Sequence, residues 1–401
     1  MSTRRAFLKW AGVATTLAPA GVLWRAWDQG LLDAEGGPAY APWTMSRSEA
    51  GEGPRGLVRA AILAASPHNI QPWRFRVAPD RVDLFDDGAR SIGAIDPYRR
   101  EVHIGLGCAL ENLVLAAGPH GYRARPTVLP DAANPAHVAR VDLSPAPATA
   151  SDLFRAIPAR HTNRGPYHRR PVPADVLGAL EALVGEEPDV AVTWYASDTD
   201  RRRVGTLVVE ATEAIVNDET QARDSGRWLR TSWRDIQRHR DGITLDAQGM
   251  PRLKRTVAKL LPPLPRGPSD HAWLQATRDV HVATAAAFGI ILVRAARSPG
   301  QRIAGGRVWQ RMHLWAVLHG LGMHPLNQIL ERSDREDSLR VAPRFERAVA
   351  ELVGRSAWQA LMPFRLGYPL EEALPSPRRA VTDVLISERQ ESRSWSTSGS
   401  S

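Results

Sequence analysis

The chain has 401 residues, a formal net charge of +9 and a single cysteine, Cys108. Its 43% hydrophobic and 24% charged residues are typical of a globular protein, which excludes a chain disordered throughout and a polytopic membrane protein. One cysteine also excludes a disulfide scaffold and a cysteine-ligated zinc or iron–sulfur centre. The positive charge is nearly all arginine, interleaved with acids along the chain, so we predict no nucleic-acid partner and assign no metal site.

The N-terminal segment has the pattern of an export signal. The pair Arg4-Arg5 precedes an uncharged apolar run from Trp10 to Trp24. A basic start before a short apolar run is typical of secretory signals, and paired arginines mark the twin-arginine type. We therefore predict an export signal or anchor over residues 1–24, the twin-arginine machinery as a partner, and a periplasmic or cell-envelope location. The other interpretation is a first helix of the fold that happens to begin with basic residues.

The next elements follow from composition and periodicity. Residues 25–54 are rich in Gly, Pro and Ala and are expected to form a surface linker. A helix of small residues is predicted over 55–65, followed by two alternating strands over 73–77 and 81–85. Further along we expect a helix starting at Pro173, a helix over 202–216 and a buried strand over 290–293. The Ser-rich residues 388–401 are expected to be a disordered tail.

An internal repeat divides the chain. Two apolar helical segments match at a constant offset of 199 residues: Gly107, Leu115, Ala117, His120 and Gly121 match Gly306, Leu314, Ala316, His319 and Gly320. The constant register favours a duplication over chance. We predict a first half over 55–150 and a second half over 151–387. The charged residues 218–272, with Trp228 and Trp233, read as an insertion in the second half that forms a lid.

Three motifs carry polar side chains suited to a ligand. Ser66-Pro67-His68-Asn69-Ile70-Gln71-Pro72-Trp73 lies between the predicted helix and strand and reads as a rigid polar cradle. Arg160, Thr162 and Arg164 alternate, so an extended backbone would point them to one side, where they suit a phosphate or a carbonyl-rich ring. Arg378-Arg379, after Pro375-Ser376-Pro377, is a second candidate phosphate clamp. Each motif also has a purely structural interpretation. The first could be a helix stop with a turn, the second a solvated basic turn, and the third a charged tail.

Taken together, these motifs resemble the nitroreductase superfamily. The resemblance rests on Ser-x-x-Asn-x-Gln-Pro-Trp at Ser66, on Arg-x-Thr-x-Arg at Arg160, and on the late Gly-Tyr-Pro followed by Arg378-Arg379. Residues 83–87 and 96–104, leading into the Gly107 helix, are similar to the Acg-like branch, in which two nitroreductase-type halves are fused. The resemblance spans residues 55–385. It implies an α+β, nitroreductase-like fold with two tandem halves forming an intramolecular pseudo-dimer.

The resemblance also implies the cofactor. Ordinary members bind FMN at a dimer interface, where one subunit supplies the arginine motif and basic clamp and the other supplies the Asn-x-Gln-Pro-Trp loop. Each of these motifs occurs once here, so one complete site and one FMN per chain are expected. The implied cofactor-binding residues are Ser66, Asn69, Gln71, Arg160, Thr162, Arg164, Arg378 and Arg379. No catalytic acid or base is nominated, since flavin chemistry needs little from side chains.

The function implied is that of an FMN-dependent oxidoreductase, with NADPH or NADH as a candidate donor and an unknown small-molecule acceptor. The main alternative is a non-catalytic FMN-binding protein, a flavin store or redox buffer whose lid shields the ring. A third class, an exported interaction module without flavin, would require that Arg160, Thr162 and Arg164 lie far from Asn69. Further homodimerisation of the fused chain is left open.

Overall fold

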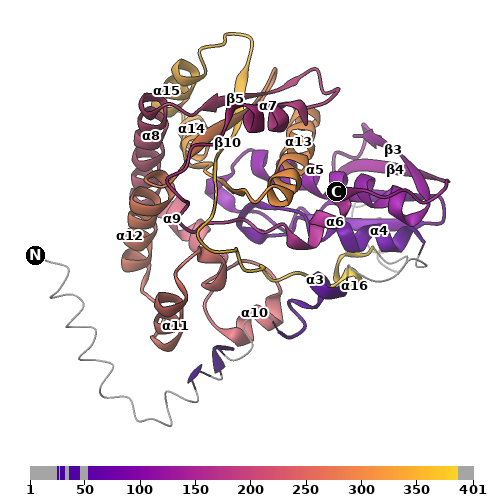
Figure 1. Cartoon of the computed structure of the whole chain (residues 1–401), viewed down its shortest axis with the longest axis horizontal. Helices are drawn as coiled ribbons and strands as arrows, with labels where there is room; N and C mark the ends of the chain where they lie inside the picture. The colour runs from indigo at the N-terminus through magenta and orange to yellow at the C-terminus, as the bar shows by residue number, and fades with distance from the viewer. Residues whose placement is uncertain (1–24, 27, 32–35, 46–52, 387–401) are drawn as a thin grey trace, which may run out of the picture.

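The computed structural model describes residues 25–26, 28–31, 36–45 and 53–386 (Figure 1). The predicted export signal and the predicted C-terminal tail lie outside the described residues. The described part is an α+β structure with two four-stranded antiparallel sheets, one in each half of the chain. The predicted α+β class and the two-half arrangement are thereby confirmed.

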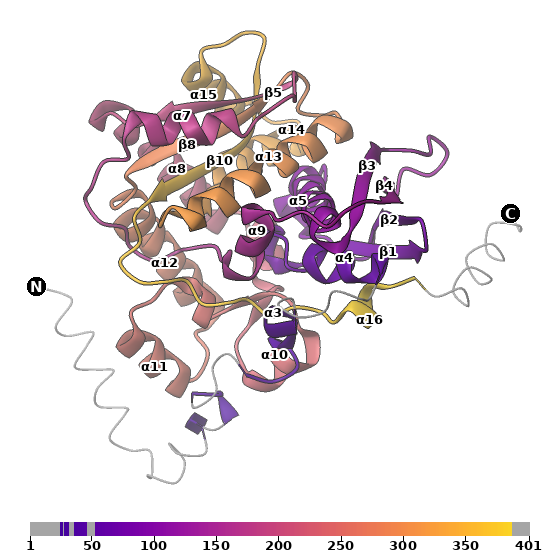
Figure 2. The same cartoon turned by 45° about the vertical axis from the view of Figure 1, so that its right-hand side comes forward.

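The first sheet contains β1 (Trp73–Ala78), β2 (Arg81–Asp86), β4 (His137–Pro145) and β3 (Tyr122–Val128), in that spatial order. Alternation in β1 places Trp73 and Phe75 in the core, as expected for a strand with one buried face. Helices α4 (Pro54–Ala61) and α5 (Arg100–Ala117) pack beside this sheet (Figure 2). By length and composition α5 could cross a membrane, but most of it is buried inside the protein.

The second sheet has the order β5-β8-β10-β9, with β5 at Val190–Tyr195, β8 at Ala287–Val293, β10 at Gln359–Gly367 and β9 at Gly322–Pro325. Every residue of β8 is buried, because strands flank it on both sides and helices cover it. Outside the insertion, the α-helices of this half are α6 (Asp152–Ala156), α7 (Ala174–Ala182), α8 (Asp198–Asn217), α13 (Pro299–Leu318), α14 (Gln328–Leu339), α15 (Arg344–Val353) and α16 (Val381–Val384). Pro173 is the N-cap of α7 rather than its first residue, and Ser197 caps an α8 longer than predicted.

The two halves meet where α5 crosses α13, and the crossing is reciprocal. A Cβ atom on Gly107 would lie 2.2 Å from the carbonyl oxygen of Ile303, and one on Gly306 would lie 2.1 Å from that of Ile104. Only glycine permits such a close approach of two helix backbones. The two contacts are related by the same offset of 199 residues as the sequence repeat. The helices are therefore packed about an approximate two-fold relationship, as the repeat predicts.

The insertion over residues 218–272 is built largely from short helices and strands. It consists of α9 (Glu219–Gly226), β6 (Leu229–Arg230), α10 (Trp233–His239), β7 (Ile243–Thr244), α11 (Arg252–Leu260) and the first part of α12 (Arg266–Ala276). Asp218 and Ser232 cap α9 and α10 by accepting backbone N–H bonds, which local composition alone did not disclose.

The prediction of a surface linker over residues 25–54 is wrong for part of that segment. Helix α3 (Ala41–Met45) contains Trp43, which is buried and donates from its indole Nε1 to the carbonyl oxygen of Ser376 at 2.8 Å. Tyr40 is also buried and stacks against Trp233 of the insertion. Aromatic side chains thus pin this segment to the C-terminal motif and to α10.

Candidate functional site

The loop between α4 and β1 has an unusual backbone. His68, Asn69 and Gln71 adopt positive φ values of 46°, 54° and 51°, the left-handed region that favours glycine. The Ser66 hydroxyl stabilises the turn by accepting the N–H of Gln71 at 3.0 Å. Strain of about 1–3 kcal/mol per residue persists where the surrounding structure enforces it, and such positions cluster at ligand sites. The turn thus has the form of a rigid, polar wall.

The C-terminal basic motif lies directly against this loop. Arg378 donates to the side-chain oxygen of Asn69, and the Asn69 amide donates back to the carbonyl of Pro377 at 2.9 Å. The Gln71 side-chain oxygen accepts the N–H of Arg379 at 2.8 Å. Two motifs that lie about 300 residues apart are therefore joined in one hydrogen-bonded unit. Arg379 itself also approaches the Asp87 carboxylate at 3.6 Å.

The side chains of the second motif, Arg160, Thr162 and Arg164, lie in two different environments. The sequence predicts one shared side for Arg160, Thr162 and Arg164; in the structure Thr162 and Arg164 line a cavity, whereas Arg160 is not among the lining residues. Arg160 is buried and donates to the carbonyl of Leu63 at 3.1 Å, at the end of the first-half helix region. Its guanidinium therefore contacts the segment that leads into the Ser66 loop.

Positive charge is concentrated in this region without compensation. In the described part of the chain no carboxylate lies within ion-pair distance of Arg160, Arg164 or Arg378. Burial lowers the pKa of Arg160 to about 10, and the neighbouring Arg164 adds to the effect. Burial also lowers the pKa of Arg164 to about 10, while burial and the adjacent Arg160 hold the pKa of Arg378 well below its usual range.

The Nε atoms of Arg160 and Arg378 are buried and have no hydrogen-bond partner. Buried charges are normally paired, since an isolated one is costly. An anion bound among these guanidiniums would raise their pKa values toward normal and satisfy the free N–H groups. The arrangement therefore has the chemistry of an anion site.

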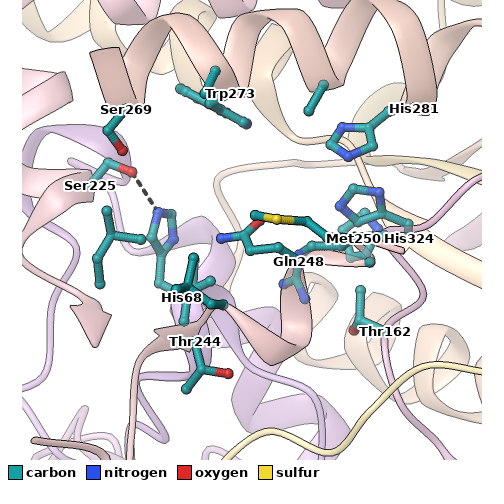
Figure 3. Close-up of a pocket in the computed structure, with 18 of the residues that line it drawn as sticks. His68, Thr162, Ser225, Thr244, Gln248, Met250, Ser269, Trp273, His281 and His324 are labelled. Carbon is teal, nitrogen blue, oxygen red and sulfur yellow. Dashed lines mark hydrogen bonds between the residues drawn. The ribbon is translucent and has the colours of Figure 1, made fainter. Parts of the chain in front are cut away.

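A cavity of about 750 Å³ adjoins the loop (Figure 3). Ser66, His68, Thr162 and Arg164 form one part of its wall, and residues of the insertion form much of the rest. His68 contacts the Ser225 hydroxyl of the insertion at 2.9 Å, and burial lowers its pKa to about 4, so it is neutral at physiological pH. Asn69, Gln71, Arg378 and Arg379 are not among the lining residues. Of the eight residues predicted from the sequence, Ser66, Thr162 and Arg164 line the cavity.

The insertion is bonded to the predicted site residues themselves. Asn69 exchanges two hydrogen bonds with the backbone of Gly242, and Gln71 donates to the carbonyl of Arg240 at 2.8 Å. Arg164 donates to the carbonyl of Ala247 at 3.0 Å. The insertion therefore covers this region in the conformation that the structure shows.

Trp228 and Trp233, the two tryptophans of the insertion, do not line the cavity. Trp228 donates to the carbonyl of Ser91 at 3.2 Å, and Trp233 packs on Tyr40. Both tryptophans hold the insertion against neighbouring segments of the protein. The tryptophans that line the cavity are Trp273, just beyond the predicted insertion (Figure 3), and Trp309 of α13.

The sequence reasoning missed several lining residues, among them Glu101, Gln248, Met250, His281 and Glu331. Burial raises the pKa of Glu101 to about 7, and that of Glu331 well above its usual range, next to Glu101. An acid in the first turn of the otherwise apolar α5 was a usable signal for Glu101. No comparable signal marks Gln248 or Met250, because their position on the cavity wall depends on how the insertion packs against the rest of the protein. Within the described residues no group of His, Cys, Asp and Glu side chains is arranged to hold a metal ion.

Comparison with known proteins gives relatives from Mycobacterium tuberculosis. "Putative NAD(P)H nitroreductase Rv3131" of Mycobacterium tuberculosis (strain H37Rv) is 26% identical over 336 residues, 82% of this chain and 90% of the relative. "Putative NAD(P)H nitroreductase acg" of the same strain is 35% identical over 120 residues, 29% of this chain and 36% of the relative. "Uncharacterized protein Rv3127" is 24% identical over 342 residues, 82% of this chain and 92% of the relative.

No family model matches the chain. Among solved structures, the FMN-dependent nitroreductase NfnB from Mycobacterium smegmatis in complex with NADPH is 17% identical, with a TM-score of 0.36 over 59% of this chain and 98% of that one. A nitroreductase with bound FMN from Bacteroides fragilis is 16% identical, with a TM-score of 0.34 over 58% and 95%. These low scores reflect partial superpositions and support no functional statement. The relatives by sequence support the nitroreductase superfamily for this chain.

Proposed function

We propose that the chain is an FMN-dependent oxidoreductase of nitroreductase type that binds one FMN between its halves, 55–150 and 151–387. The observation that carries the proposal is a set of three guanidiniums with no carboxylate partner in the described structure. Those of Arg160 and Arg378 are buried, and that of Arg164 lines the cavity. A phosphate monoester is an anion that such a set binds well, since guanidinium–phosphate hydrogen bonds are charge-assisted. The names of the relatives agree with the proposal.

The residues present fit the cofactor. Arg160 and Arg378 have free buried N–H groups suited to its phosphate, and Arg379 is adjacent but already shares Asp87. Ser66 and Thr162 lie on the cavity wall, where they suit the ribityl chain and ring edge, while Asn69 and Gln71 fix the loop and Arg378. Arg164 lines the same cavity, which suits a role in which its charge acts on the ring. FMN, when bound, supplies the hydride and electron transfer.

The chain's own groups would bind, orient and exclude water. A guanidinium beside the ring favours its anionic reduced form electrostatically. Glu101, whose pKa is raised by burial to about 7, would hold a proton at the cavity wall near neutral pH, and burial raises the pKa of the neighbouring Glu331 as well. Trp273 and Met250 give the cavity apolar surfaces (Figure 3). NADPH or NADH is the proposed donor, and a small-molecule acceptor would share the cavity.

The test is the absorbance spectrum of the purified full chain, followed anaerobically by NADH and then by dithionite. Bound flavin that NADH bleaches supports the oxidoreductase, and an acceptor screen would follow. A chain without flavin, even after soaking with FMN, would remove the proposal and favour an interaction module. Arg160→Met and Arg378→Met are expected to lower the flavin content, whereas Arg347→Met on exposed α15 is the matched control.

One observation favours a second candidate, a flavin store or redox buffer. The insertion supplies much of the cavity wall and is bonded directly to Asn69, Gln71 and Arg164. If it stays closed over the ring, a nicotinamide cannot approach. Flavin that dithionite bleaches but NADPH and NADH do not would favour this candidate over the enzyme.

We also propose export through the twin-arginine route, on the strength of Arg4-Arg5 and the apolar run that follows. Replacing both arginines by lysine is expected to leave the protein in the cytoplasm, as measured by cell fractionation. Unchanged periplasmic or envelope recovery of that variant would rule out this route.

A further inference from the structure

Helix α11 presents an unusual outer face. Leu253 is 78% exposed, the highest value among the large hydrophobic residues that are exposed in the described structure, and Val257 is 47% exposed. Their spacing of four residues places them on one side of the helix. Leu264, in the loop that follows, is 46% exposed. In both views α11 lies at the edge of the molecule, at the end opposite α15 (Figures 1 and 2).

The same segment is strongly basic. Between Asp246 and Asp270 the sequence contains no acidic residue and five basic ones: Arg252, Lys254, Arg255, Lys259 and Arg266. Lys259 and Arg255 face inward and pair with Asp246. Arg252 and Lys254 have no carboxylate within ion-pair distance among the residues that the structure describes. The outward face of α11 therefore combines apolar side chains with uncompensated positive charge.

The N-terminal part of the chain joins the described structure at this same place. Arg25 donates from Nε to the carbonyl oxygen of Leu260 at 2.9 Å and from Nη2 to that of Leu261 at 2.8 Å. The apolar run of the sequence ends at Trp24, one residue earlier. Arg25, which directly follows the segment read as an export signal or anchor, therefore lies at the C-terminal end of α11.

We propose that α11 and the loop to Leu264 form a docking surface for an anionic phospholipid bilayer. Leu253, Val257 and Leu264 would enter the interface, and Arg252 and Lys254 would contact the headgroups. Helices with an apolar face flanked by Lys and Arg bind in the plane of such interfaces. Each basic residue near an anionic surface strengthens binding by about fivefold.

Charge favours a bilayer over a second copy of the chain as the occupant. Two copies joined through this face would bring their Arg252 and Lys254 side chains together, and like charges at an interface oppose association. An anionic bilayer instead attracts the positive charges of Arg252 and Lys254. Lys254 and Leu264 also line the cavity, so the docking surface borders the candidate site.

The test uses the full chain with an environment-sensitive fluorophore on L253C, and on V341C, between α14 and α15, as the matched control position. The native Cys108 is buried, and burial raises its pKa to about 12, so it should not compete for the label. With phosphatidylglycerol vesicles we expect a blue shift and a several-fold rise in emission at position 253 but not at 341. Phosphatidylcholine vesicles should give a much smaller change.

A second experiment tests the contribution of positive charge to vesicle binding. R252Q in the labelled chain should weaken docking by about fivefold, measured as the anionic lipid needed for half of the emission change. R347Q on α15 should leave it unchanged. Vesicle-bound protein with unaltered emission at 253 would overturn the proposal. So would a blue shift without vesicles, because a second copy or another part of the chain would then cover this face.

Discussion

The side-chain oxygen of Asn69 accepts a hydrogen bond from Arg378, although 309 residues separate the two in the chain. This bond joins the loop after the first helix to the basic motif near the C-terminus. Arg160 reaches the same region through the carbonyl of Leu63. The three motifs singled out in the sequence therefore converge, and the expectation that they would lie far apart in a protein without flavin is not met.

Replacing Arg378 tests whether the uncompensated charge serves an anionic ligand. Arg378→Met removes a buried guanidinium whose pKa burial holds far below its usual range. A hydrogen bond to a charged group contributes about 1.5–3 kcal/mol, so we expect FMN to bind about 10- to 100-fold more weakly. Titration followed by flavin fluorescence measures the affinity. Arg347→Met should bind FMN like the unaltered chain, and equal affinity in both variants would contradict the assignment.

The helix crossing offers a test of the fold. Gly306→Ala would place a Cβ atom 2.1 Å from the carbonyl oxygen of Ile104, so the two helices must separate. Overpacking of this kind costs about 1–3 kcal/mol or more. In contrast, Gly178→Ala on α7 has nothing within 4 Å and should stabilise by about 0.5–1 kcal/mol. Urea unfolding measures both, and a neutral Gly306→Ala would argue against the close crossing.

Much of the first half follows from sequence patterns because its contacts are local. The strands over 73–77 and 81–85 were predicted nearly to their ends, since alternation and a short turn define an antiparallel pair. The repeat located the α5–α13 crossing through Gly107 and Gly306. The second sheet could not be assembled in this way: β5, β8 and β10 pair across segments of more than 60 residues, and no local pattern selects the partner.

The candidate site was proposed from its motifs, whereas the rest of the cavity wall was not expected from the sequence. Ser66, Asn69 and Arg378 could be nominated because the loop and the clamp are each contiguous in sequence. Glu331 and Trp273 reach the cavity through the packing of α14 and α12, which sequence spacing does not show. Trp228 and Trp233 pack against the rest of the protein, but the sequence did not show that their partners would be Ser91 and Tyr40.

The raised pKa of Glu101 should make the free energy of unfolding depend on pH. Burial raises its pKa from 4.5 to about 7, so the native state holds this proton more tightly than the unfolded state. The free energy of unfolding should therefore fall as pH rises through this range and level off above about pH 7, by up to about 3 kcal/mol. Glu101→Gln should reduce the fall, whereas Glu346→Gln on the exposed face of α15 should not. Denaturant unfolding between about pH 5 and pH 8 measures the slope; an unchanged slope in Glu101→Gln would refute the assignment.

We expect the ion pairs of Asp241 to limit the mobility of the insertion. Its buried carboxylate accepts from Arg230 of the insertion at 2.7 Å and from Arg90 of the first half at 3.0 Å. Asp241→Asn leaves Arg230 without its counter-charge and Arg90 with only Asp87, at 3.7 Å, so it should loosen the insertion. We expect faster proteolysis within residues 218–272 and faster reduction of bound flavin by NADH. Asp175→Asn, exposed at the start of α7, is the control, and equal rates in both variants would show that Asp241 does not hold the insertion closed.

The most direct test of the account is the flavin stoichiometry of the full chain after soaking with FMN and gel filtration. The structure brings together one set of loop, arginine motif and clamp, so one FMN per chain is expected, and much less in the double variant Arg160→Met/Arg378→Met. A spectrum without flavin would contradict the central claim, as would an unchanged flavin content in the double variant.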